Sequence, residues 1–117
     1  MSHSLFTHSS AGEVQILELL LPHNIDAGQF DFLNERVGQL VDERANGRWV
    51  LDLAQVEYSG SAMLGLLVNL RQRIKQGGGS LVLCRLSERL QQTLATCSLD
   101  RLFKTVSTRE MAVKVES

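Results

Sequence analysis

The sequence predicts an α/β fold in which helices pack against a small, mostly parallel sheet. Short apolar runs typical of buried strands alternate with longer segments whose apolar residues recur at helical spacing. The clearest pair is a strand at Trp49–Leu53 followed by a helix at Ser61–Gln76. No repeat, linker or low-complexity segment interrupts the alternation. Residues 1–117 are therefore expected to form one domain, with a core over about 13–113.

Three elements are expected before this strand. Residues 1–10 are polar and form either an irregular N-terminal segment or an edge strand that opens near Leu5. Glu13–Leu21 alternates apolar and polar residues at its start, which is typical of a strand. From Ala27 to Arg44 the apolar residues share one helical stripe, and Asp26 precedes it as a candidate cap.

Shorter elements follow the central helix. They are a strand at Ser80–Cys84, a helix capped by Ser87, a strand at Lys104–Val106 and a helix at Thr108–Val115. In the last helix Met111 is expected to face inward. Cys84 and Cys97 form no C-x-x-C pair and lack metal-ligand spacing, so two free, buried thiols and no metal site are expected.

Composition argues against several functional classes. A formal net charge of −1, few aromatic residues and no clustered Lys/Arg face argue against nucleic-acid binding. No apolar run has the length of a membrane span, and the first residues lack a signal-peptide pattern. A cytoplasmic protein without direct membrane insertion is therefore expected. The glycines at 77–79 lack the lysine and Ser/Thr of a phosphate loop, so no nucleotide cofactor is expected.

The candidate functional site is the helix start at 58–61, which carries small, hydroxyl-bearing residues. Unpaired N–H groups and the helix dipole favour negative charge at such a position. Ser61 is either an N-cap or the carrier of a phosphate, and Ser59 is a second candidate for phosphorylation. No G-x-S-x-G elbow surrounds Ser61 and His23 alone lies at a plausible turn, so no catalytic residue and no enzymatic activity are expected.

The order and spacing of the elements resemble the STAS domain family, named after sulfate transporters and anti-sigma factor antagonists. VLDLAQVEYSGSAMLGLL, GGGSLVLCRLSERLQQTLATCSLDRLF and the Asp26 turn carry the resemblance, which extends from about Glu13 to about Val113. It implies a small mixed sheet with about four helices, largely on one face. It also implies that the protein regulates by binding another protein.

In free-standing bacterial members, the domain captures an anti-sigma factor that is also a serine kinase. Phosphorylation of a serine at this helix start breaks the complex, and the matching position here is Ser61. A monomer or weak dimer is expected. The partner-binding residues that the resemblance implies lie at two helix starts: Asp26, Ser59, Gly60, Ser61, Ala62, Met63 and Leu64.

The helix start departs from the family pattern Asp-Ser-Ser/Thr-Gly-Leu-Gly. Gly60 replaces the aspartate, Ala62 the second hydroxyl and Met63 the first glycine, whereas Ser61 and Leu64 are kept. Two alternative functions therefore stay open. One is an accessory subunit that docks on the ATPase of a lipid-exporting ABC transporter, and the other is a scaffold component of a larger sensory assembly.

Three side chains have two interpretations each. Asp26 is a helix cap or a partner-recognition residue. Asp52 is a strand-end carboxylate bonded to nearby backbone N–H groups, or a site residue. Met63 is expected to be exposed or half-buried at the helix start, where it contacts a partner or packs in the core.

Overall fold

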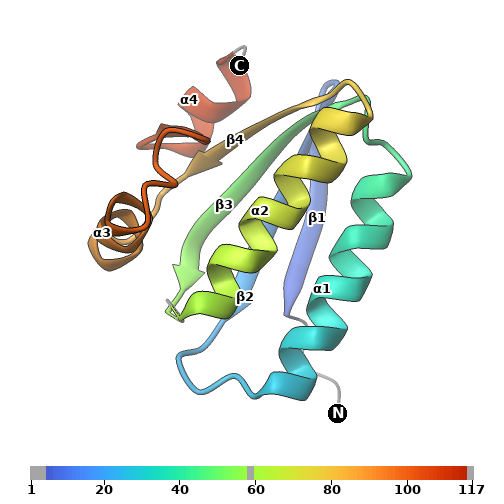
Figure 1. The fold of residues 1–117 in the computed structure, drawn as a ribbon. Helices are drawn as coiled ribbons and strands as arrows, with labels where there is room; N and C mark the ends of the chain where they lie inside the picture. The colour runs from blue at the N-terminus through green and yellow to red at the C-terminus, as the bar shows by residue number, and fades with distance from the viewer. Residues whose placement is uncertain (1–4, 58–59, 116–117) are drawn as a thin grey trace.

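A five-stranded mixed sheet forms the centre of the molecule in this computed structural model, which describes residues 5–57 and 60–115 (Figure 1). The strands lie in the order β1-β2-β3-β4-β5. Their bounds are β1 (Phe6–Ala11), β2 (Val14–Leu21), β3 (Arg48–Val56), β4 (Ser80–Cys84) and β5 (Lys104–Val106). β1 pairs antiparallel with β2, and every later pair is parallel. The α/β fold with a mixed sheet is confirmed.

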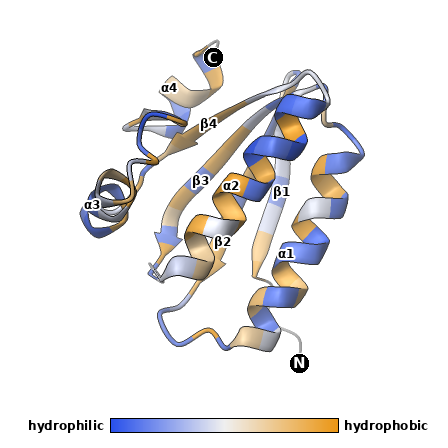
Figure 2. Cartoon of the chain, in the orientation of Figure 1, coloured by the Kyte–Doolittle hydropathy of each residue, from blue (hydrophilic) through white to orange (hydrophobic). Residues whose placement is uncertain are grey.

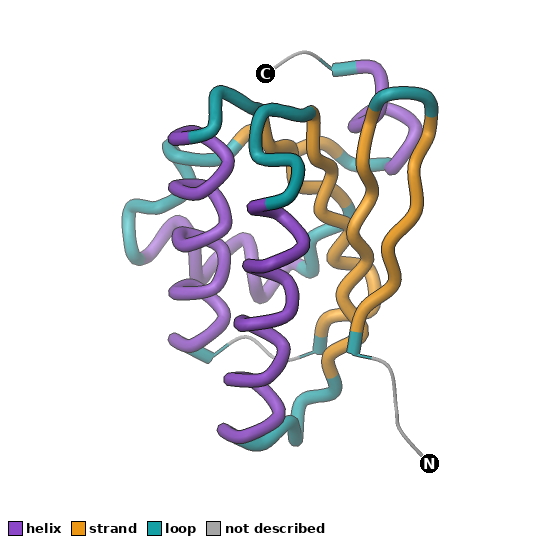
Figure 3. The backbone as a smooth tube through the Cα atoms, turned by 90° about the vertical axis from the view of Figure 1, so that its right-hand side faces the viewer, coloured by secondary structure: helices purple, strands orange, loops and turns teal. Residues whose placement is uncertain are grey.

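Helices follow the parallel strands, as this topology requires. Their bounds are α1 (Ala27–Asp42), α2 (Ser61–Gln76), α3 (Glu88–Thr96) and α4 (Arg109–Lys114). Figure 3 shows α1 and α2 on one side of the sheet and α4 on the other. The buried residues of α1, α2 and α3 belong to one apolar cluster, whereas Ala112 of α4 belongs to a second. The helices therefore lie largely on one face, as the family resemblance implied.

The main core lies between the sheet and the helices α1, α2 and α3. Trp49 is 2% exposed there, and its Nε1 donates to the carbonyl oxygen of Arg44 at 2.9 Å. On α2 the buried residues recur at helical spacing: Met63, Leu66, Leu67, Leu70 and Ile74. This apolar stripe holds α2 across the sheet and thereby fixes the position of its first turn.

In its described part, the N-terminal segment forms the edge strand β1. β1 returns into β2 through a turn in which Gly12 has a φ of +61°, a conformation that favours glycine. Figure 2 shows β1 in pale colours and β4 largely in the orange of hydrophobic residues. This contrast is expected, because β4 lies between two strands and β1 has one exposed edge.

Two expectations about burial near the C-terminus are wrong. Met111 is 47% exposed, and the next residue, Ala112, faces the sheet with 1% exposure. The helix is six residues long, so its apolar pattern is too short to fix which side faces inward. Cys97 is exposed at the C-cap of α3, whereas Cys84 is buried in β4 as expected.

Candidate functional site

The candidate site lies at the edge of the sheet where the parallel strands β2 and β3 end. The backbone N–H of Glu57 donates to the carbonyl oxygen of Leu21 at 2.8 Å, which joins the two segments that leave these strands. His23 Nδ1 lies 3.4 Å from Glu57 Oε2 on the same surface. Figure 1 shows α1 and α2 both beginning near this edge. The fold thus brings the Asp26 turn and the Ser61 turn to one side of the molecule.

Ser61 is exposed at the first residue of α2. The N-cap is Gly60, whose backbone is extended (φ −72°, ψ 175°) and which offers no side-chain cap. The N-cap interpretation of Ser61 is therefore wrong, because its backbone is already helical and its hydroxyl makes no capping bond. A solvent-facing hydroxyl at the first turn of a helix is sterically open to a modifying enzyme. A phosphate on the Ser61 hydroxyl would lie near the backbone N–H groups of that turn.

Asp26 is the N-cap of α1, which confirms the capping interpretation. Its Oδ1 accepts from the backbone N–H of Gln29 at 2.7 Å, and its own N–H donates to Gln29 Oε1 at 3.1 Å. This reciprocal capping box fixes the start of α1. Asp26 is also exposed, so its carboxylate remains part of the molecular surface.

Met63 is 0% exposed, and the expectation of an exposed or half-buried side chain is wrong. Its position starts the apolar stripe of α2, so it packs in the core and cannot touch a partner in this conformation. Ala62 is exposed and Leu64 is half-buried, so both contribute to the surface around Ser61. Ser59 lies outside the described residues.

Asp52 is the centre of an ionic cluster on the face of the sheet opposite α1 and α2. Its side chain is 0% exposed and accepts from Arg85 Nη2 at 2.6 Å and from Arg109 Nε at 2.8 Å. The backbone N–H of Ala54 also donates to Asp52 Oδ1, at 3.1 Å. Glu18 on β2 completes the cluster, because both guanidinium groups lie within 3.6 Å of its Oε2. The expected backbone N–H bond is present, but two arginines surround the carboxylate as well.

The pKa values in this cluster have identifiable physical causes. Burial alone would raise the pKa of Asp52, but hydrogen bonds from Arg85, Ala54 and Arg109 outweigh it and leave the pKa below its usual value. Burial, followed by the negative charge of Asp52, raises the pKa of the neighbouring Cys84 thiol to about 11. Asp52 is therefore a charged structural centre, and Cys84 is an unreactive thiol while it stays buried.

Arg85 and Arg109 were not identified from the sequence. Asp52 and Cys84 are register partners in the parallel β3–β4 pair, so Arg85 follows directly beside the carboxylate. That neighbourhood could have been inferred from the two strands. Arg109 comes from α4, 57 residues away along the chain, and no local pattern indicates it.

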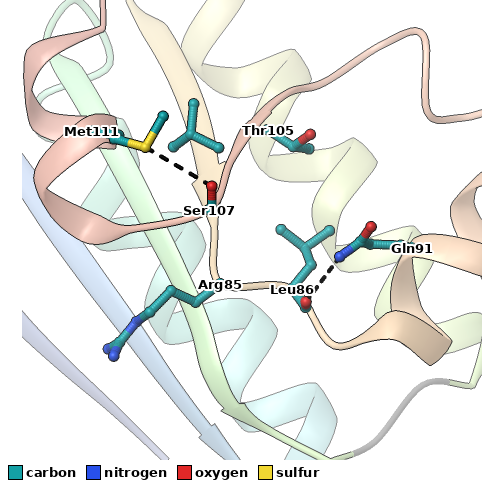
Figure 4. Close-up of a pocket in the computed structure, with 7 residues that line it drawn as sticks. Arg85, Leu86, Gln91, Thr105, Ser107 and Met111 are labelled. Carbon is teal, nitrogen blue, oxygen red and sulfur yellow. Dashed lines mark hydrogen bonds between the residues drawn. The ribbon is translucent and has the colours of Figure 1, made fainter.

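A cavity of about 420 Å³ opens between the ends of β4 and β5, α3 and α4. Figure 4 shows Gln91 bonded to the carbonyl oxygen of Leu86 and Ser107 directed at Met111. Its lining mixes polar and apolar side chains: Arg85, Leu86, Gln91, Thr105, Val106, Ser107 and Met111. It contains neither Asp26 nor Ser61, so the candidate site is an exposed surface separate from this cavity.

Residues 5–57 and 60–115 contain neither a metal-binding cluster nor a membrane-spanning helix. No three His, Cys, Asp or Glu side chains of these ranges gather where they could hold a metal ion. No helix in the same ranges is both long and apolar enough to cross a membrane.

Solved structures of several proteins share this fold, and three of them illustrate the likeness. A candidate anti-sigma factor antagonist from Thermotoga maritima is 24% identical with a TM-score of 0.81, covering 93% of this chain and 92% of that one. An anti-sigma-factor antagonist (STAS) domain protein from Planctomyces limnophilus is 20% identical with a TM-score of 0.80, covering 92% and 94%. The Bacillus cell fate determinant SpoIIAA, in its phosphorylated form, is 14% identical with a TM-score of 0.68, covering 92% and 96%.

The fold defines a small α/β domain with a five-stranded mixed sheet. The STAS domain family matches residues 11–112, nearly the whole chain, and the chain belongs to this family. The family resemblance seen in the sequence is thereby confirmed.

Proposed function

We propose that this protein is a cytoplasmic anti-sigma factor antagonist, which binds an anti-sigma factor that is also a serine kinase and is released by phosphorylation of Ser61. The observation that carries the proposal is the position of Ser61. Its hydroxyl is exposed in the first turn of α2 and is not used as a helix cap. The protein acts by binding and carries out no catalytic step of its own.

The proposed docking region is the helix-start surface, which we define as Asp26, Gly60, Ser61, Ala62 and Leu64. These residues lie at the sheet edge where α1 and α2 begin, and none of them is fully buried. Met63 is left out because its side chain lies in the core. Ser59 keeps its place as a partner-binding residue and second phosphorylation candidate, since it directly precedes Gly60 in the sequence.

The proposed switch is electrostatic. A phosphate adds about −1.5 to −2 charge, and within a docked surface it brings repulsion and a desolvation cost. The first turn of α2 contains no acidic residue, so its N–H groups and helix dipole stabilise the phosphorylated free protein. Phosphorylation therefore favours the free protein over the complex.

The comparisons support this proposal at the level of fold and class. A Bacillus protein of the same fold is known in a phosphorylated form, which makes covalent phosphate compatible with this architecture.

The test uses tagged protein to capture partners from an extract of the native organism, followed by mass spectrometry. Wild type and Ser61→Ala should both recover a serine kinase of the anti-sigma type. Ser61→Asp should recover at least about tenfold less, which corresponds to about 1.4 kcal/mol of binding free energy. Gln76→Glu adds a negative charge at the exposed far end of the same helix and should bind like wild type. Equal recovery by Ser61→Asp and Gln76→Glu would refute the switch.

A second candidate function is the accessory subunit of a lipid-transporting ABC system. One observation favours it: the first turn of α2 carries no carboxylate, whereas the family pattern places an aspartate directly before the serine. In that case the capture experiment recovers a transporter ATPase, and the Ser61 substitutions change its recovery by similar, small factors.

A further inference from the structure

Strand β1 forms one edge of the sheet, and its outer side has no strand beside it in the described part of the chain. Soluble proteins usually protect such an edge with a lysine, a proline, a β-bulge or a very short strand. β5, at the other edge, has two of these features, because it is three residues long and begins with Lys104. β1 has none of them: its six residues include no Lys, Arg, Asp, Glu or Pro and pair with β2 without a bulge. The edge at β1 is therefore the one that is open to pairing.

The backbone of β1 directs hydrogen-bonding groups outward at this edge. The N–H of Leu20 donates to the carbonyl oxygen of Leu5 at 2.8 Å, which sets the alternation of the β1–β2 ladder. Every second residue from Leu5 onward therefore bonds to β2, whereas His8 and Ser10 direct their N–H and C=O groups away from it. Both residues are exposed, so a second strand can approach these groups.

Helix α1 borders the same edge (Figure 1). Side chains of β1 and α1 line a groove of about 180 Å³ between the two elements: Phe6, His8, Arg36, Gln39, Leu40 and Glu43. On α1 the half-buried Leu40 lies between Arg36 and Glu43, which are exposed and have opposite charges. Neither charge forms an ion pair among the described residues. The open strand is thus accompanied by one cation and one anion on the neighbouring helix.

A second copy of this chain fits this surface by symmetry. Two β1 strands related by a two-fold axis perpendicular to the sheet run antiparallel, so the outward groups of each copy meet donors and acceptors of the other. The same axis reverses α1 relative to its counterpart. With the axis near Leu40, Arg36 of each copy comes opposite Glu43 of the other. Because β1 contains no acidic or basic residue of fixed charge, the two strands meet without repulsion between like charges.

We propose that two copies of this chain associate through β1 into a two-fold symmetric dimer with one continuous sheet, and that Arg36 and Glu43 form its two symmetric ion pairs. The paired segment is short, so the interface is small and association depends on protein concentration. The helix-start surface lies at the end of the sheet where β2 and β3 end, so it is not part of this interface. The dimer does not depend on the proposed regulatory function.

The first measurement is the molecular mass of the purified chain by sedimentation equilibrium, from about 1 μM to about 1 mM protein. The mass should rise with concentration from 13.0 kDa toward twice that value. Ser10→Pro removes an outward N–H that β2 does not use, and it should weaken association at least about tenfold. The matched control Ser10→Thr keeps this N–H and should associate like wild type.

Charge reversal tests the arrangement of the two α1 helices. Glu43→Arg places like charges opposite each other and should weaken association at least about tenfold. Adding Arg36→Glu to the same chain restores opposite charges and should restore association. The control Glu35→Arg makes the same change of charge at an exposed position of α1 outside the groove, and it should associate like wild type.

A wild-type protein that keeps the mass of one chain throughout this concentration range overturns the proposal. A dimer that either Ser10→Pro or Glu43→Arg leaves as strong as wild type also overturns it, because such a dimer uses a different surface. The wild-type measurement decides by itself whether a dimer forms. Recovery of association in the double charge variant shows that the loss in Glu43→Arg comes from the interface and not from misfolding.

Discussion

Replacing Asp52 by asparagine tests the ionic cluster that joins β2, β3, β4 and α4. The substitution keeps the size of the side chain and removes its charge. Asp52 accepts hydrogen bonds from two guanidinium groups and one backbone N–H. Asparagine keeps one acceptor oxygen, but its NH₂ group then faces arginine donors, which it cannot satisfy.

The magnitude follows from the exposure of the arginines. Removing one member of a fully buried ion pair costs about 3–5 kcal/mol, because the remaining charge stays unpaired in a dry interior. Here the side chains of Arg85 and Arg109 are 42% and 36% exposed, so water recovers part of that loss. We expect Asp52→Asn to lower the free energy of unfolding by about 2 kcal/mol, or the melting temperature by about 8 °C.

The loss of unfolding free energy in Asp52→Asn should become smaller as the pH falls. The pKa of Asp52 in the folded protein lies below its usual value, so its stabilising contribution is complete above the unfolded-state pKa. It disappears as the pH falls through the folded-state pKa. The stability difference between wild type and Asp52→Asn is therefore constant from about pH 7 to pH 5 and shrinks below about pH 4.

The assay is urea unfolding followed by the fluorescence of Trp49, the single tryptophan, at neutral and acidic pH. Carboxylates outside the cluster titrate in both proteins and cancel in the difference. The reasoning is refuted if the two proteins differ by less than about 0.5 kcal/mol at pH 7, within the range of ordinary surface substitutions. A difference of the same size at pH 7 and at pH 3 would also contradict it.

Three further predictions concern α1, α2 and the turn before β4. Asp26→Ala removes the capping box and should lower the free energy of unfolding, measured with urea, by about 1 kcal/mol. An unchanged free energy of unfolding would show that the capping box does not stabilise α1. Met63→Ala should cost about 2–5 kcal/mol because its side chain is fully buried, while a cost below 1 kcal/mol would place it at the surface. Gly79→Ala places a Cβ in steric overlap with the backbone carbonyl oxygens of Ala45 and Gly47 and should lower the free energy of unfolding by at least about 2 kcal/mol. Its control, Gly65→Ala, meets nothing within 4 Å on an exposed helix face and should stabilise by about 0.5–1 kcal/mol; similar melting temperatures for the two alanine variants would contradict the pair.

The fold was predictable because its elements repeat a simple pattern. The apolar run at Trp49–Leu53 and the helical spacing after Ser61 specify a buried strand and the helix beside it, and both are present. Short elements were less predictable. The six residues of α4 make too few turns for their apolar pattern to show which side faces the sheet. Met111 was therefore expected to face inward, whereas Ala112 does so.

The candidate site was predictable in position but not in detail. The sequence places a serine at a helix start, but a shift of one residue decides whether it caps the helix or faces solvent, and here Gly60 takes the cap. Because the helix begins at Ser61, Met63 falls on the buried side of α2. The ionic cluster was not predictable, because Arg109 reaches Asp52 through tertiary packing between α4 and β3, and sequence periodicity carries no such information.

The most direct test of the central claim is the fate of Ser61 in the presence of its partner and ATP. The captured partner is incubated with the purified protein and ATP, and the products are mapped by mass spectrometry after separation of bound and free protein. We expect one phosphate on Ser61, found in the free fraction and absent from the bound one. A complex that persists with ATP while Ser61 stays unmodified would contradict the proposed switch.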